Sequence, residues 1–315
     1  MGDTLQVLVQ IAPVFLTLIF GTLLRKYAFK DAAPWDVLNS LVYWFLAPML
    51  LFYSILSANL QFSNIVSYLL VLFLGLMGTF SVVALVCNRL NFSLPVCNST
   101  VQGACRHNTF MALAISASLM GEAGLAIATL ATAFQVVITN LCVMGYITSY
   151  TQNPDGKISW GKLLLKLSFN PLLLSIFAAL LIKISGFDYL PIISETTSLI
   201  GRSAMPISLL AAGAGLTLSV EREKIVPLVT GVMAKMVIFP VFVLLFGWLF
   251  ELSPEYFLVA FIYAAVPTAA SSYVVARLTG GDAPLLSSMT LFQVILSFFS
   301  FGALVLFFDF SLVLK

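Results

Sequence analysis

The five residues FQVVI at positions 134–138 recur as FQVIL at positions 292–296, 158 residues further along the chain. The same separation joins two prolines of the first half to two of the second half: Pro13 with Pro171, and Pro48 with Pro206. One separation shared by three apolar segments indicates an internal repeat. Because twice 158 is nearly the chain length of 315 residues, the sequence predicts two repeats, residues 1–157 and 158–315.

The composition places these repeats in a membrane. Hydrophobic residues make up 61% of the chain and charged residues 9%, whereas a soluble domain has about 25% charged residues. So little charge excludes most soluble folds, a nucleic-acid binder and a disordered chain. The four cysteines form no CxxC pair and His107 is the single histidine. We therefore expect no metal and no cofactor.

Ten segments are long and apolar enough to be membrane-spanning helices. They are residues 5–24, 37–57, 65–88, 99–118, 124–149, 162–184, 192–218, 225–250, 256–276 and 284–308. Five segments in each half is an odd number, so the second repeat starts on the opposite side of the membrane. The sequence thus predicts an all-α membrane protein of two inverted five-helix repeats, an architecture typical of secondary transporters.

Basic residues in the short loops predict the orientation. If the N-terminus is outside, ten Lys and Arg residues fall in inside loops and two fall outside. We therefore expect both termini outside. The N-terminus also lacks a basic region before its first apolar run, so we interpret that run as a span and not as a cleaved signal peptide.

The fourth segment contains the most polar run of the membrane region, GACRHNTFM at positions 103–111. The ninth segment, AAVPTAASSY at positions 264–273, is also small and polar, and a separation of 158 pairs Pro267 with Thr109. Polar or proline-interrupted spans at equivalent places in two repeats indicate broken helices, whose N-terminal ends suit an anion. The alternative is that small residues only allow close helix packing. The candidate substrate-binding residues are Arg106, His107, Asn108, Thr109, Pro267, Thr268, Ser271 and Ser272.

Three further polar residues in predicted spans are candidates for coupling or support. Gln135 and Gln293 occupy equivalent places, where their amides either coordinate a cation or substrate or hydrogen-bond between helices. Lys235 is either a coupling or counter-charge residue, or its ammonium group reaches the interface or pairs with a backbone carbonyl. Arg202 is predicted to lie at the interface, and Glu122 and Asp282 are predicted to cap loops.

The whole pattern resembles the auxin efflux carrier family, which includes bacterial malate and malonate carriers and the plant PIN auxin carriers. The resemblance rests on the five-plus-five spans, on RHNTF at positions 106–110 and on AVP at positions 265–267. It implies that Asn108 contacts the substrate. It also implies a scaffold domain of spans one, two, six and seven, a transport domain of the other six spans, crossing broken helices, elevator-type movement and a homodimer.

The sequence departs from the plant carriers in two respects. Those carriers have a proline at each helix crossing, and the corresponding positions near Ala114 and Ser272 have none. The central linker, residues 151–157, is short, so we expect a bacterial carrier in the inner membrane.

The leading functional expectation is a secondary carrier of a small organic carboxylate anion, with no enzymatic activity. The coupling ion stays open, with His107 and Lys235 as candidates for proton transfer. The alternatives are a sodium-coupled symporter of the bile-acid type and a channel or transporter-like sensor. An intramembrane protease is disfavoured because the chain has no HExxH motif and no paired membrane aspartates.

Overall fold

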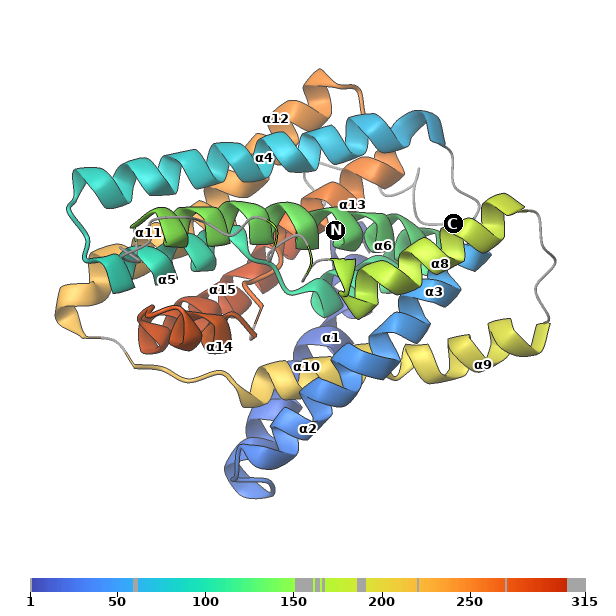
Figure 1. Cartoon of the computed structure of the whole chain (residues 1–315), viewed down its shortest axis with the longest axis horizontal. Coiled ribbons are helices and arrows are strands. Elements are labelled where there is room, and N and C mark those ends of the chain that lie inside the picture. Colours follow the sequence, from blue (N-terminus) through green and yellow to red (C-terminus); the bar gives the residue numbers. More distant parts are fainter. Residues whose placement is uncertain are drawn as a thin grey trace.

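The fold is all-helical, as the sequence predicts. The computed structural model describes residues 2–58, 62–150, 161, 165, 168–185, 191–219, 221–269 and 271–304, and no strand occurs among them (Figure 1). The α-helices of the first half are α1 (Gly2–Tyr27), α2 (Ala33–Leu41), α3 (Ala47–Ser57), α4 (Phe62–Arg89), α5 (Leu94–Cys105) and α6 (Thr109–Tyr150). Those of the second half are α8 (Pro171–Ser185), α9 (Pro191–Arg202), α10 (Ala204–Ala214), α11 (Ile225–Met233), α12 (Phe239–Leu249), α13 (Pro254–Ala265), α14 (Ser271–Leu278) and α15 (Ala283–Leu304).

Six helical stretches of the described residues are long and apolar enough to cross a membrane. They are Leu5–Tyr27, Ala33–Ser57, Asn64–Arg89, Leu94–Val143, Arg222–Leu249 and Ala283–Gly302, and two shorter apolar helices are Pro171–Ser185 and Pro254–Ala265. A chain with several such helices is a multi-pass membrane protein. The count of ten spans and their inverted relation stay predictions.

Two π-helical turns join neighbouring α-helices into longer continuous helical segments. Val42–Leu46 connects α2 to α3, and Ala234–Ile238 connects α11 to α12. The second of these turns contains Lys235. A π turn changes the direction in which the following side chains project, and such turns are frequent at functional sites. α6 is also bent, because Gly121 has φ 60° and divides it into two helical parts.

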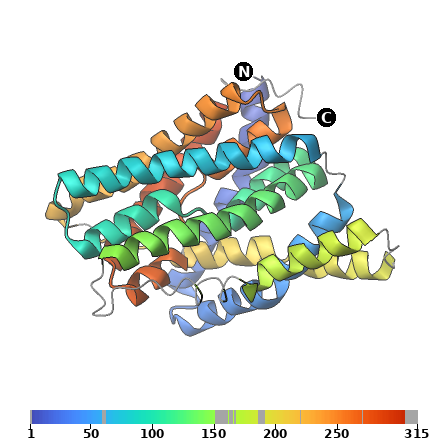
Figure 2. The ribbon, with the colours of Figure 1, turned by 45° about the horizontal axis from the view of Figure 1, so that its top comes forward.

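The helices pack in two groups. α3 packs on α8 and α9, and α1 on α10, whereas α4 packs on α12 and α5, α11 on α5, and α13 on α6. In Figure 1, α8 and α9 accordingly lie beside α3, on the side away from α11 and α12, and Figure 2 shows the same separation from another angle. α6 contacts members of both groups, namely α1, α3 and α10 on one side and α13 on the other.

Glycines set the closest contact within the first group. A Cβ atom on Gly21 of α1 would lie 2.0 Å from the carbonyl oxygen of Leu210 on α10, and one on Gly213 would lie 1.9 Å from that of Leu18. Only glycine allows the two backbones to approach this closely, which is the usual way in which membrane helices pack tightly. α1 and α10 therefore form a closely packed pair.

Candidate functional site

Two interruptions of helical structure meet inside the second packing group. α5 ends at Cys105 and α6 begins at Thr109, while α13 ends at Ala265 and α14 begins at Ser271. The backbone N–H of Asn108 in the first interruption donates to the carbonyl of Pro267 in the second, at 2.7 Å. The polar runs that the sequence singled out in the two halves are thus in direct contact.

The structure refines one expectation about these interruptions. Cys105 and Ala265, the last residues of α5 and α13, are 160 residues apart, so at these helix ends Pro267 aligns with His107, whereas the separation of 158 pairs it with Thr109. The interruptions also precede the positions near Ala114 and Ser272 at which the plant carriers have their prolines, since both of these residues lie inside helices. Pro267 lacks the N–H that a continuing helix needs, which places the break earlier in the chain.

The polar side chains of the first interruption, residues 106–108, make few contacts with the rest of the structure. The Asn108 side chain caps α6 by accepting a hydrogen bond from the backbone N–H of Met111 at 3.1 Å. Arg106 donates to the side-chain oxygen of Asn140 at 3.1 Å, and the His107 ring packs edge-on against Tyr263. Nε of Arg106 and Nδ1 of His107 are buried and have no hydrogen-bond partner among the described residues. These groups are therefore available to a ligand.

The second interruption is closed by side chains. Oε1 of Gln293 accepts a hydrogen bond from the N–H of Thr268 at 2.8 Å, and its Nε2 donates to the carbonyl of Gly103 at 2.8 Å. The Thr268 hydroxyl donates to the same carbonyl at 2.5 Å. Gln293 and Thr268 are both fully buried. The Gln293 amide thus hydrogen-bonds between helices, as one of the two interpretations proposes, and joins α15 to both interrupted helices.

Gln135, the counterpart of Gln293, makes no such contacts. It is fully buried, yet neither its amide oxygen nor its amide nitrogen has a partner among the described residues. It lies on α6 one turn beyond Thr132, which contacts the Tyr263 hydroxyl at 2.5 Å. Asn140, the partner of Arg106, lies a further turn along the same helix. Gln135 thus lies on the stretch of α6 that faces the first interruption.

Lys235 is fully buried on the π turn between α11 and α12. Its ammonium group donates to the backbone carbonyl of Tyr263 at 3.2 Å and lies 4.6 Å from the centroid of the Phe239 ring. Of the interpretations considered for Lys235, the structure thus shows the pairing with a backbone carbonyl. No Asp or Glu is buried in the part of the chain that the structure describes, so neither Lys235 nor Arg106 has a buried carboxylate partner there.

The remaining candidates contribute less to the site. Thr109 is half-buried at the start of α6, and Ser271 is exposed. Ser272 is buried, and its hydroxyl has no partner in the described structure. Sequence reasoning missed Tyr263 and Asn140. Both are polar groups within apolar spans, and a buried tyrosine hydroxyl or amide needs a partner, which is the signal that could have found them.

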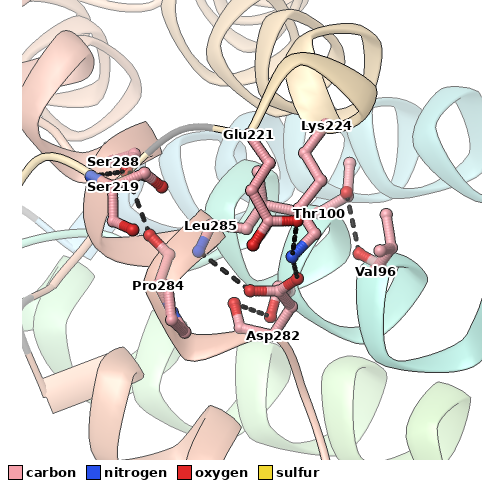
Figure 3. A network of polar contacts seen from close by, with 10 residues as sticks. Val96, Thr100, Ser219, Glu221, Lys224, Asp282, Pro284, Leu285 and Ser288 are labelled. Carbon is pink, nitrogen blue, oxygen red and sulfur yellow. Dashed lines mark hydrogen bonds and ion pairs between the residues drawn. The ribbon is translucent and has the colours of Figure 1, made fainter.

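A polar seam joins the helix ends away from the interruptions (Figure 3). Lys224 lies between Glu221 and Asp282, with an N–O distance of 2.9 Å to each carboxylate. Asp282 also accepts a hydrogen bond from the N–H of Leu285 at 3.0 Å, so its predicted capping role is correct. Glu122 forms an ion pair with the exposed Arg202 instead of capping a loop.

The comparison with protein families agrees with this arrangement. Residues 157–304 match the family model described as Membrane transport protein, the domain of the auxin efflux carrier family. The second half of the chain, residues 157–304, is thus similar to this domain. A comparison with curated proteins gives no sequence match. The family consists of membrane transporters, so the match indicates a membrane transporter. The two interruptions are the candidate substrate site.

Proposed function

We propose that this auxin efflux carrier domain protein is a secondary active transporter of a small organic carboxylate anion, such as malate, malonate or an auxin-like acid. The carrying observation is the first interruption, where Arg106 provides positive charge and no buried Asp or Glu occurs among the described residues. A cation in the membrane interior is costly unless a partner or a wet cavity compensates it. A carboxylate substrate supplies that partner.

The groups without partners suit such a substrate. Nε of Arg106 can donate to a carboxylate oxygen, and the buried amide of Gln135 on α6 also has no partner among the described residues. The N-terminal end of α6 adds the positive end of a helix dipole. Asn108, Arg106 and Thr109 thus hold the anion, and His107 and Gln135 complete the site.

The proposed architecture has ten spans in two inverted five-helix repeats, residues 1–157 and 158–315. The first packing group is the scaffold domain, through which two copies form a homodimer. The second is the transport domain, which carries the crossing interruptions across the membrane in an elevator-type motion. The tight glycine contact between α1 and α10 supports a rigid scaffold. The proposal also includes a bacterial inner membrane as the location and both termini outside.

Counterflow in liposomes tests this proposal. The purified protein is reconstituted with unlabelled malate, malonate or indole-acetate inside, and uptake of the same labelled acid is measured with and without pH and Na⁺ gradients. We expect counterflow of at least one carboxylate and none of a neutral sugar. If no carboxylate exchanges although the protein is folded and inserted, the organic-anion proposal is wrong.

A further inference from the structure

The C-terminal ends of α5 and α13 present equivalent carbonyl groups. The last intrahelical bond of α5 runs from the N–H of Arg106 to the carbonyl of Gln102, and that of α13 runs from Val266 to Ile262. The next carbonyl in each helix, Gly103 in α5 and Tyr263 in α13, needs a donor from elsewhere. These two carbonyls are 160 residues apart, the same separation as the helix ends.

Different chemical groups satisfy the two carbonyls. Gly103 accepts from two neutral donors, the Thr268 hydroxyl and the Gln293 amide. Tyr263 accepts from the ammonium group of Lys235. Gln135, which corresponds to Gln293, has no hydrogen-bond partner among the described residues. An amide thus completes the end of one half-helix, and a cation completes the other.

The surroundings of Lys235 suit a cation that pairs with the end of a helix. The side chain is fully buried, its ammonium group faces the Phe239 ring, and none of the ion pairs of the described residues includes it. The C-terminal end of a helix carries a partial negative charge, and a cation there is favourable. In transporters with broken helices, such C-terminal ends and unwound carbonyls bind coupling cations.

We propose that Lys235 is a positioning residue whose ammonium group acts as a built-in cation at the end of α13. It occupies the place that a bound metal cation would otherwise take, so this helix end requires no Na⁺. The consequence for transport, uptake without dependence on Na⁺, rests on the proposed function. The effect on the helix end does not.

Hydrogen–deuterium exchange of the purified full chain tests the helix end directly. Lys235→Met keeps most of the side-chain volume and removes the charge, whereas Lys235→Arg keeps the charge. We expect peptides within residues 258–269 to exchange about tenfold faster in Lys235→Met, because one charge-assisted hydrogen bond is lost. In Lys235→Arg they should exchange near the wild-type rate. Unchanged exchange in Lys235→Met would overturn the proposal.

Lys183 offers a matched control. Its ammonium group donates to the carbonyls of Ile55 and Leu56 and to that of Ala58, at the end of α3 and away from both interruptions. Lys183→Met should speed exchange within residues 50–57 and leave residues 258–269 unchanged. Faster exchange at both places would mean that the effect is general unfolding, and the proposal would be wrong.

A chemical rescue separates charge from space. Lys235→Ala removes the atoms of n-propylammonium, and n-propanol has nearly the same size without the charge. We expect n-propylammonium to slow exchange of residues 258–269 in this variant and n-propanol to have no such effect. Equal effects of the two compounds, or none from either, would overturn the proposal.

The last arm concerns sodium. Exchange of residues 258–269 in the wild-type chain should be the same in NaCl and in choline chloride, and so should malonate counterflow. A wild-type chain protected or stimulated by Na⁺ would overturn the proposal. If malonate does not exchange in either salt while the exchange results are as expected, the proposed function fails and the role of Lys235 at the helix end stands.

Discussion

The two helix interruptions lie against each other, yet their hydrogen bonds are completed to different degrees. At the second, Gln293 accepts a hydrogen bond from the Thr268 N–H, and the Gln293 and Thr268 side chains both donate to the Gly103 carbonyl, so every amide atom of Gln293 has a partner. In the first, Arg106 and His107 each keep an unpaired nitrogen. A buried polar group without a partner is costly. The difference indicates that the second interruption supports the fold and the first retains groups for a ligand.

The largest expected effect comes from the residue at the centre of the first interruption. Asn108→Ala removes the α6 cap and a proposed substrate contact, so we expect carboxylate counterflow to fall by about a hundredfold, as for the loss of one hydrogen bond to a charged group. Cap loss alone costs only about 1 kcal/mol of stability. Counterflow and thermal unfolding of the purified variant measure the two effects separately.

Asn170 provides the control for Asn108→Ala. Its side-chain oxygen accepts from the backbone N–H groups of Leu172 and Leu173, so it also caps a helix, but at α8 in the other packing group. Asn170→Ala should lose similar stability and keep counterflow. Near-normal transport by Asn108→Ala, or an equal loss in both variants, would contradict the assignment of the site.

The glutamine pair gives the next largest effect, and it acts on stability. Gln293→Leu leaves the Thr268 N–H without its acceptor and removes one donor from Gly103, so we expect a loss of about 3 kcal/mol in the free energy of unfolding. Gln135→Leu removes an amide without partners and should leave stability unchanged or raise it. Denaturant unfolding of both variants measures the difference.

For transport we expect the opposite order, with Gln135→Leu affected more than Gln293→Leu. Gln135→Leu takes away a proposed ligand contact, so its counterflow should fall although the protein is stable. If Gln135→Leu is as destabilised as Gln293→Leu, the two amides have the same role and the contrast between the interruptions is wrong.

Much of this arrangement follows from the sequence, because its signals are local. Long apolar segments predict helices, and the run at positions 103–111 marks the first interruption by its Arg, His and Asn within a span. The contrast between Gln135 and Gln293 could not be predicted, since identical residues at one separation imply identical roles. The separation at the helix ends is 160 and not 158 residues, a local shift that a repeat of apolar segments does not reveal.

The hydrogen-bond partner of Lys235 also could not be predicted from the sequence. Its acceptor is a backbone carbonyl, which every residue carries, so no residue type identifies it. The π turn that places Lys235 at Tyr263 has no clear sequence pattern either. The pairing with some carbonyl was foreseeable from the lack of buried acids, but the particular carbonyl was not.

A smaller effect is expected for Thr268→Val, which keeps the shape of the side chain and removes its hydroxyl group. Gly103 then retains only the Gln293 amide as a donor. We expect a loss of about 1–2 kcal/mol in the free energy of unfolding, with substrate affinity in counterflow unchanged. A large rise in the substrate concentration for half-maximal counterflow would show that the second interruption also binds the ligand.

The smallest effect should come from Tyr263→Phe, which separates the side chain of Tyr263 from its carbonyl. The hydroxyl donates to Ala128 and contacts Thr132, so its loss should cost about 1 kcal/mol. The backbone carbonyl and its bond to Lys235 stay in place. Exchange of residues 258–269 should therefore remain the same in NaCl and in choline chloride, as in the wild type. If Na⁺ instead slows exchange of these residues in Tyr263→Phe, the Tyr263 side chain and not the Lys235 ammonium group stabilises the end of α13. The difference between the two interruptions would then need another explanation.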